Sequence, residues 1–297
     1  MRNPVLSQKG KAVFLTILAG ILWGTSFPVI KIGLVYTNPF AFVFWRFLVS
    51  SLSMLLITLF LRKLEFKIPD KRLLIFLGIA NGVGYVLQYV GMNYATAAQA
   101  ALFINLSAMW VALLSPRLLG ETFSRKKIIG VLFGLVGIVF VSTNLDFSTL
   151  MGGQLFGDAL LLTAGVTWAL FMIYNKKFVG TNSTSATFQS MTWVLLFTLF
   201  SIAPFSLLAG SKFFALSGQA WLAVFYTAIV CWILPYYLWL EGLKHLSAST
   251  STVLLLSEIV MAVILSIAVL KEPVTIFSSI GALFIVIAIV LVSVKTK

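Results

Sequence analysis

Charged residues are scarce in this chain of 297 residues: they make up 10%, with 21 Lys and Arg against 8 Asp and Glu. A soluble domain carries about a quarter charged residues, so this scarcity excludes a water-soluble enzyme and a disordered chain. The single cysteine, Cys231, excludes an internal disulfide and with it a secreted disulfide scaffold. The single histidine, His245, has no Cys or carboxylate at metal-ligand spacing. We therefore expect no metal site and no cofactor.

Motifs of catalysis are also missing. No nucleophile–base constellation, paired-carboxylate site or phosphate-binding loop occurs in the sequence. Gly130, Gly134 and Gly137 share one helical face, but no strand precedes them, so close helix packing explains them better than a dinucleotide loop. The sequence thus predicts that the protein is not an enzyme and has no catalytic residue.

Long apolar runs are what the chain has in abundance. Hydrophobic residues make up 60% of it and the mean hydropathy is +1.06. A helix needs about 20 apolar residues to cross a bilayer. Runs of about this length fall at residues 12–33, 40–61, 73–94, 98–118, 127–144, 156–178, 187–209, 219–243, 248–270 and 276–294. The runs are too long for barrel strands and do not alternate. They predict an all-α membrane protein with ten transmembrane helices.

The positions of the basic residues indicate orientation. With the amino terminus in the cytoplasm, 17 of the 21 Lys and Arg lie on the inner side. The outer side keeps Lys31, Lys212 and Lys271, and Arg46 lies inside a span. Because cytoplasmic loops are enriched in Lys and Arg, the net charge of +13 points to membrane orientation and not to nucleic acid. We expect a multi-pass protein of the cell membrane with both termini cytoplasmic, the lipid bilayer as partner and no nucleic-acid partner.

The second half of the chain resembles the first. At an offset of 151, residues 91–142 align with 242–293 without a gap, and 14 of the 52 pairs are identical, including Glu121 with Glu272. Near offset 145, Trp23 and Lys31 align with Trp168 and Lys176. We predict one five-helix repeat over residues 1–146 and a second over 147–297.

The two repeats are expected to have opposite orientations, because each holds an odd number of spans. The basic residues agree. Arg117, Arg125, Lys126 and Lys127 flank the inner turn of the first repeat, whereas their partners in the second repeat, at 268 and 276–278, are uncharged. This pattern is typical of the inverted-topology repeats of secondary transporters.

Several motifs resemble the EamA family of the drug/metabolite transporter superfamily. They are the Trp23-Gly24-Thr25-Ser26-Phe27 opening, Arg46 early in the second span, and the segments Asn105–Glu121 and Ser257–Glu272. The family pattern commonly has Leu-Glu-Pro where this chain has Ser257-Glu258-Ile259, so the proline that would distort the helix is absent here. The resemblance implies ten-helix carriers, many of which export amino acids or other small metabolites.

No nucleotide-binding domain is present to supply energy, so we expect a secondary transporter driven by an ion or solute gradient. It would export small organic metabolites, such as amino acids, by alternating access, with a small-molecule solute as its partner. The alternative is a membrane sensor or scaffold that transports nothing.

Glu258 and Arg46 are charged residues inside predicted spans, where charge is costly. Glu258 sits near the middle of the ninth span, either as a carboxyl group that couples transport to protons or as a neutral group bonded to a neighbouring helix. Arg46 lies near the outer end of the second span. It either extends toward the interface or contacts a carboxylate of the protein or the solute.

Uncharged polar and aromatic residues complete the predicted site. Asn81, Tyr85 and Gln88 share one helical face, as a cavity wall or as interhelical hydrogen-bonding groups, and Asn105 is a similar single residue. Among the aromatic residues of the spans, those predicted to line the cavity are Trp23, Trp168, Trp232 and Tyr236. Packing or an interfacial belt is the alternative role for each. Pro28, Pro116 and Pro235 are expected to kink their helices.

Overall fold

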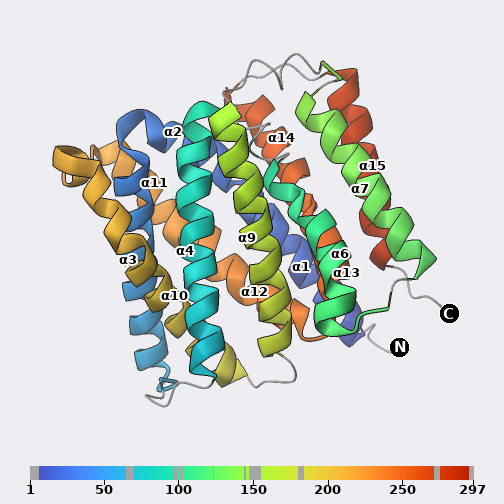
Figure 1. Ribbon diagram of the computed structural model, residues 1–297, viewed down its shortest axis with the longest axis horizontal. Coiled ribbons are helices and arrows are strands. Elements are labelled where there is room, and N and C mark those ends of the chain that lie inside the picture. The colour runs from blue at the N-terminus through green and yellow to red at the C-terminus, as the bar shows by residue number, and fades with distance from the viewer. Residues whose placement is uncertain are drawn as a thin grey trace, which may run out of the picture.

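The computed structural model describes residues 7–64, 70–95, 100, 103–122, 124–143, 145–146, 155–179, 184–270 and 275–293. All regular secondary structure in these ranges is helical, as the sequence predicts (Figure 1). The first half contains α1 (Gln8–Gly24), α2 (Ser26–Tyr36), α3 (Pro39–Phe60), α4 (Lys71–Tyr94), α6 (Ser107–Leu119) and α7 (Arg125–Thr143). The second half contains α9 (Leu155–Val179), α10 (Thr184–Ser206), η1 (Leu207–Phe213), α11 (Gly218–Ala228), η2 (Ile229–Ile233), α12 (Leu234–Leu243), α13 (Ala248–Leu255), α14 (Ser257–Leu270) and α15 (Ile276–Ser293).

The protein is a multi-pass membrane protein by the length and composition of its helices. Six are long and apolar enough to cross a bilayer: Gln8–Tyr36, Pro39–Phe60, Lys71–Tyr94, Phe156–Val179, Ala186–Ser211 and Gly218–Leu243. Shorter apolar helices cover Phe103–Leu119, Ala248–Ala262 and Ser279–Leu291. Each of the ten predicted apolar runs contains a described helix.

Local signals explain where several helices begin and end. The Asn38 side chain caps α3, and Pro39 follows at the first helical position, where a missing N–H leaves no hydrogen bond unmade. Ser247 caps α13 in the same way. At the end of α6, Gly120 adopts φ 65°, a left-handed conformation that favours glycine and stops the helix.

Several of the described helices follow one another along a single membrane-crossing segment, called a rod here, with a break between them. The α1–α2 rod changes at Thr25, before Pro28. The rods that contain α6 and α13–α14 break at Leu106 and Leu256, both with φ −60° and ψ −12°. In the α11–α12 rod, the π-helical turn η2 lies just before Pro235, where the ring removes a backbone donor.

Two of these interruptions are not marked by a proline. The break before α6 is at Leu106, and Pro116, which the sequence predicts as a kink, lies later, in the last turn of α6. The α13–α14 rod breaks at Leu256 even though Ile259 replaces the family's proline. Tight packing against α1 explains the second break, because an added Cβ at Gly20 would clash with Ser257 and lie 3.1 Å from the Leu255 carbonyl oxygen.

Contacts between the two halves recur at equivalent positions. As Gly20 of α1 packs on the break of α13–α14, so Gly165 of α9 packs on the break before α6, where a Cβ would lie 2.8 Å from the Phe103 carbonyl oxygen. Gly91 of α4 packs on α9, and Gly242 of α12 packs on α1. Gly20 and Gly165 lie 145 positions apart, and Gly91 and Gly242 lie 151 positions apart. These are the two offsets at which the sequence repeats.

Two lysines form a further matched pair. Lys31 of α2 donates to the carbonyl oxygens of Met92 and Ala95 at the end of α4, the latter at 2.7 Å. Lys176 of α9 donates to the carbonyl oxygen of Leu243 at the end of α12, at 2.8 Å. In each half, a lysine of the first membrane-crossing segment (α2 or α9) thus donates hydrogen bonds to backbone carbonyl groups at the end of the third (α4 or α12).

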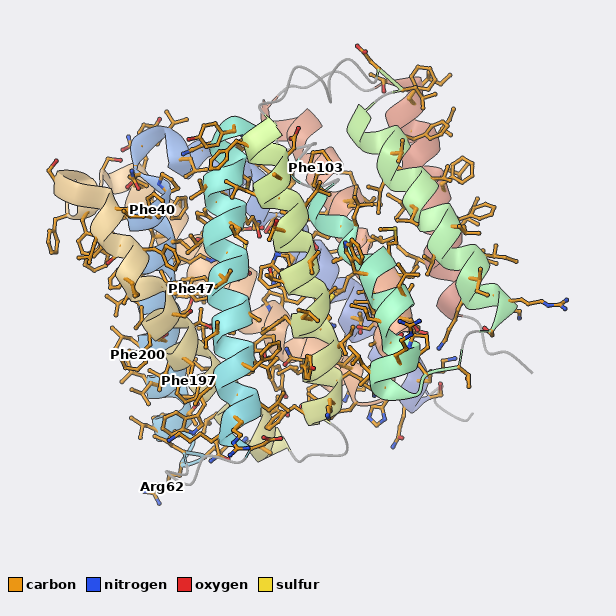
Figure 2. All side chains as sticks on the ribbon, in the orientation of Figure 1. Phe40, Phe47, Arg62, Phe103, Phe197 and Phe200 are labelled. Carbon is orange, nitrogen blue, oxygen red and sulfur yellow. The ribbon has the colours of Figure 1, made fainter. Side chains whose placement is uncertain are left out.

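The outer surface is apolar and the interior contains polar groups. Figure 2 shows Phe200 on the outside of the bundle and Arg62 at one end of it. Phe200 is 71% exposed and Leu222 73%, whereas Asn81 is 0% exposed and Arg46 1%. This distribution suits a lipid environment, where buried polar side chains face protein and not hydrocarbon.

Candidate functional site

A cavity of about 60 Å³ lies inside the bundle, between elements of both halves. Its wall includes residues of α1, α4, α6, α9, α12, α13 and α14 together with the turns at Leu106 and η2. All eight predicted cavity residues line it: Trp23, Asn81, Tyr85, Gln88, Asn105, Trp168, Trp232 and Tyr236. Glu258 lines it as well, and Arg46 lies behind Tyr85. The structure therefore gathers every predicted site residue in one region.

The polar face of α4 forms one side of the cavity. Asn81, Tyr85 and Gln88 all lie in its wall. The Asn81 amide also donates to the Thr198 hydroxyl of α10 at 3.0 Å. Asn81 thus both lines the cavity and joins two helices.

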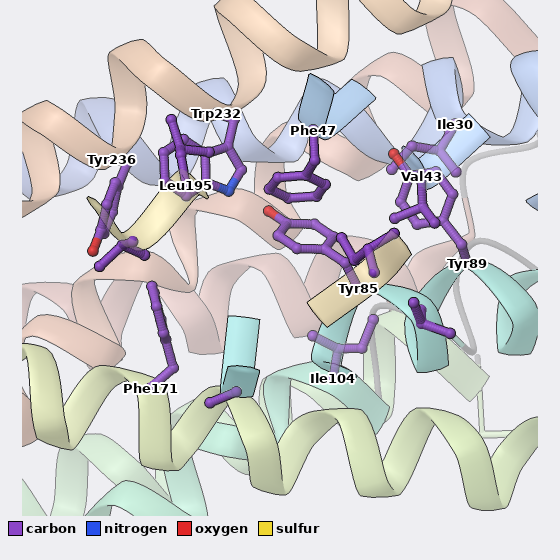
Figure 3. Packing of buried hydrophobic residues seen from close by; sticks show 14 of the residues in the cluster. Ile30, Val43, Phe47, Tyr85, Tyr89, Ile104, Phe171, Leu195, Trp232 and Tyr236 are labelled. Carbon is purple, nitrogen blue, oxygen red and sulfur yellow. The ribbon is translucent and has the colours of Figure 1, made fainter. Parts of the chain in front are cut away.

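Six further aromatic side chains line the cavity. Figure 3 shows Tyr85 beside Phe47 and, farther along, Tyr236 with Trp232 on one side and Phe171 on the other. The ring centroids of Tyr85 and Trp168 are 4.7 Å apart at 83°, an edge-to-face arrangement that aromatic pairs favour. Packing and cavity lining are again combined in the same residues.

The structure adds residues that the sequence-based selection missed. Phe171, Trp239, Ser26 and Thr252 also line the cavity. A helical spacing was available for two of them, since Phe171 follows Trp168 by three positions and Trp239 follows Tyr236 by three. Ser26 and Thr252 had no such signal, because small hydroxyl residues are common in packed membrane helices.

Polar groups on α12 are paired within the protein. The Tyr236 hydroxyl donates to the Asn175 side-chain oxygen at 2.8 Å. The Trp239 indole N–H donates to the Ser251 hydroxyl at 2.8 Å. Both bonds are buried, so this side of the cavity is fixed by internal hydrogen bonds.

Other polar atoms of the wall have no partner. The indole nitrogens of Trp23 and Trp168 and the side-chain oxygen of Asn81 are buried without a hydrogen bond. Arg46 has the same property at its Nε. In the described residues, eight side-chain atoms are buried and unpaired, and these four are half of them. Three of these four atoms belong to residues of the cavity wall, and Arg46 lies behind Tyr85. Such atoms are uncommon in folded proteins.

Arg46 points into the protein and does not extend to the interface. Its Nη1 donates to the Tyr89 hydroxyl at 2.7 Å, and Nη2 lies 3.4 Å from both the Tyr85 hydroxyl and the Cys231 carbonyl oxygen. The guanidinium carbon is 4.5 Å from the centre of the Tyr85 ring, a cation–π contact. No carboxylate of the described residues forms an ion pair with it.

Glu258 lies in the first turn of α14, immediately after the break at Leu256. A helix amino terminus is a favourable place for a carboxyl group, because unpaired N–H groups and the helix dipole stabilise negative charge there. The backbone of Glu258 packs on Gly24 of α1, where an added Cβ would clash with the Glu258 carbonyl oxygen. The break and this glycine together bring the carboxyl group to the cavity.

No group of three or more His, Cys, Asp or Glu side chains that could hold a metal occurs in the described ranges. His245 is exposed at the end of α12.

Comparison with known proteins decides the family. The sequence profile of the EamA-like transporter family matches residues 10–143 and again residues 155–294. The chain belongs to the EamA-like transporter family. This EamA-like transporter is 27% identical over 280 residues to the uncharacterized transporter YyaM of Bacillus subtilis, covering 92% of this chain and 90% of that protein. It is 30% identical over 282 residues to an uncharacterized transporter of Archaeoglobus fulgidus, covering 94% and 84%.

A solved structure shares the fold of this EamA-like transporter. The TM-score is 0.76, with 94% of this chain and 97% of that chain covered, at 20% sequence identity. The family resemblance inferred from sequence motifs is thus confirmed, and transport is the function class.

Proposed function

We propose that this EamA-like transporter is a secondary carrier that exports small organic metabolites, such as amino acids, by alternating access. The observation that carries the proposal is the cavity, because its wall combines elements of both halves with aromatic rings, amides and one carboxyl group. Ligand sites in membrane carriers of repeat architecture lie at such an interface. The energy would come from a gradient acting through Glu258.

The architecture we propose is a pair of inverted five-helix repeats, residues 1–146 and 147–297, with ten spans. The family profile matches the chain twice, which supports two repeats. The equivalent glycine and lysine contacts of the two halves support a two-fold relation between them. In Figure 1, α1 begins and α15 ends at the same end of the bundle, which supports an even number of spans with both termini on one side of the membrane.

The cavity must widen for transport. At about 60 Å³ it is smaller than the ~150 Å³ cavity that admits benzene in a protein core. The breaks at Thr25, Leu106 and Leu256 adjoin the cavity and offer places where half-helices can rotate. We infer that the structure represents a contracted state between the two open ones.

One contact between the halves closes the end at which α1 begins. The Glu121 carboxylate, in the turn after α6, accepts hydrogen bonds from the backbone N–H of Ala248 and Ser249 and, at 2.8 Å, from the Ser249 hydroxyl. It therefore caps α13 of the opposite half. Opening of this end would break these bonds, so Glu121 favours the closed arrangement.

Glu258 would couple the solute to protons. A carboxyl group that binds a proton from one side and releases it to the other links the movement of solute to the proton gradient. One charge crossing 100 mV is worth about 2.3 kcal/mol, enough to concentrate a solute about fiftyfold. The position of Glu258 in the cavity wall supports this role.

Transport in proteoliposomes tests the proposal. Labelled metabolites are measured with and without an imposed pH gradient, for the parent and for Glu258→Gln. We expect the parent to carry at least one metabolite and the variant to keep solute exchange while losing gradient-driven accumulation. Glu241→Gln is the matched control, since Glu241 pairs with Lys244 away from the cavity.

Two outcomes would contradict the proposal. If the parent carries no member of a broad metabolite panel, the sensor or scaffold alternative replaces transport. If Glu258→Gln accumulates solute as the parent does across pH 5–8, the coupling role of Glu258 is wrong.

A further inference from the structure

The backbone of the α11–α12 rod lacks one hydrogen-bond donor, at Pro235. In an α-helix the N–H of residue 235 would donate to the carbonyl oxygen of Cys231, four positions earlier, but proline has no N–H. The chain forms the π-helical turn η2 at this place, in which the Leu234 N–H donates to the Ile229 carbonyl oxygen. A carbonyl group without a donor is costly in a membrane interior. The Cys231 carbonyl therefore needs a donor from another part of the protein.

The helix α3 supplies this donor. Nη2 of Arg46 lies 3.4 Å from the Cys231 carbonyl oxygen. One helical turn farther along α3, the Ser50 hydroxyl donates to the carbonyl oxygen of Ala228, directly before η2, at 3.1 Å. Two side chains on one face of α3 thus bind the backbone of the π-helical turn.

The same guanidinium also contacts α4, which forms one wall of the cavity. Besides the bond from Nη1 to the Tyr89 hydroxyl, Nη2 lies 3.4 Å from the Tyr85 hydroxyl, and the guanidinium carbon lies 4.5 Å from the centre of the Tyr85 ring. Tyr85 lines the cavity, and Arg46 lies behind it. A guanidinium can serve acceptors on two helices at once, because it carries five N–H donors in one rigid plane. Arg46 thus joins η2 to the cavity wall from outside the cavity.

The proline and the arginine are both departures from the sequence repeat. At the offset of 151, Pro235 aligns with Gly84, which has an N–H group, and α4 passes through this position as one unbroken helix. Positions 191–197, which offsets of 145 to 151 assign to Arg46, contain no Lys or Arg. The missing donor and the side chain that replaces it are therefore both additions to the scaffold that the two halves share.

We propose that Arg46 is a positioning residue for transport. Its guanidinium takes the place of the backbone donor that Pro235 lacks and joins η2 to Tyr85, so that the α11–α12 rod and the α4 wall move as one unit when the cavity widens. A charged side chain inside the membrane, with no ion pair in the described residues, has a role that offsets its cost. The effect on turnover rests on the proposed transport function, whereas the contacts with η2 do not.

The single cysteine of the protein is a probe at the right place. Cys231 belongs to η2 and is 0% exposed, so the rate at which a membrane-permeant maleimide labels it in the folded protein reports the opening of this turn. Arg46→Met removes the donors and keeps an unbranched side chain, so labelling is expected to become about tenfold faster. Adding Pro235→Ala supplies a backbone N–H for the Cys231 carbonyl, so labelling of the double variant should return toward the rate of the parent.

A second proline provides the matched control. Pro204 lies inside α10, and the carbonyl that it leaves without an α-helical donor is that of Phe200. Arg46→Met combined with Pro204→Ala should be labelled as fast as Arg46→Met alone. All rates are measured well below the melting temperature of each variant, so that global unfolding does not contribute. If Arg46→Met does not fold, Arg46→Lys keeps the charge without the planar fork, and we expect the same acceleration to a smaller extent and the same rescue by Pro235→Ala.

Exchange of a carried metabolite in proteoliposomes tests the effect on transport. Because Arg46 does not line the cavity, Arg46→Met should lower the maximal rate about tenfold and leave the half-saturating concentration within about twofold of the parent's. A changed half-saturating concentration at an unchanged maximal rate would overturn the positioning role.

Two labelling results would also overturn the inference. One is an equal rate for the parent and the Arg46 variant, and the other is an acceleration that Pro204→Ala relieves as well as Pro235→Ala does. Absence of flux for every metabolite is the separate result that removes the proposed function. The labelling rates then still decide whether Arg46 replaces the donor that Pro235 lacks.

Discussion

The two sides of the cavity differ in whether their polar groups are hydrogen-bonded to other groups of the protein. On α12, the Tyr236 hydroxyl and the Trp239 indole donate to acceptors of the protein, Asn175 and Ser251. On the first rods of the two halves, the indoles of Trp23 and Trp168 have no acceptor. Both sides are aromatic, so composition does not distinguish them. The hydrogen-bonded groups of α12 therefore hold the wall in place, whereas the unpaired indoles of Trp23 and Trp168 are available to bind a ligand.

Thermal unfolding, which tests this comparison, can be followed through the protein's single cysteine. Cys231 is the single cysteine and is 0% exposed, so a thiol-reactive dye reports unfolding. Differences in melting temperature then give relative stabilities of variants.

The largest effect is expected from a substitution that displaces the wall with the unpaired indoles, where α1 packs on α14. Gly24→Ala should destabilise the protein by about 3 kcal/mol, because the new Cβ would clash with the Glu258 carbonyl oxygen and lie 2.9 Å from Cβ of Met261. Gly218→Ala, where no atom lies within 4 Å, should leave stability almost unchanged. Equal melting temperatures for the two variants would contradict the close approach of α1 and α14.

The next effect probes the paired wall. Asn175→Ala should cost about 2 kcal/mol, because it leaves the buried Tyr236 hydroxyl without its acceptor. Adding Tyr236→Phe should recover part of the loss, since the unpaired hydroxyl is then gone. A double variant whose loss equals the sum of the single losses would show that the two groups do not interact.

A smaller loss is expected at the second bond of that wall. Ser251→Ala should cost about 1.5 kcal/mol by leaving the Trp239 indole unpaired. Thr252→Val is a neighbouring control whose hydroxyl bonds only within its own helix, to Ala248 at 2.8 Å and Ser249 at 3.2 Å. The comparison fails if the control loses as much stability as Ser251→Ala.

The smallest effect separates the two walls directly. Trp239→Phe, Trp23→Phe and Trp168→Phe each remove the same volume and the same N–H group. Only Trp239 loses a hydrogen bond, so its variant should be less stable than the other two by about 1 kcal/mol. If all three variants had the same melting temperature, the Trp23 and Trp168 indoles would have to be hydrogen-bonded as Trp239 is, and the contrast between the two walls would be wrong.

The sequence determined the class of the protein because its signals are local and repetitive. Apolar runs, basic clusters and the offsets of 145 and 151 required no knowledge of packing. Several residues that line the cavity could also be predicted from the sequence, because polar side chains are unfavourable in lipid and must face the protein interior. For that reason Asn81, Tyr85, Gln88 and Glu258 could be selected from the sequence alone.

Tertiary structure alone decided which of these groups find partners. The position of the break at Leu256 depends on packing against Gly20, and no proline marks it. The direction of Arg46 depends on Tyr85 and Tyr89, which lie about 40 residues away in sequence. Whether an indole meets an acceptor depends on distances of a few tenths of an ångström between helices, and a linear pattern carries no information at that scale.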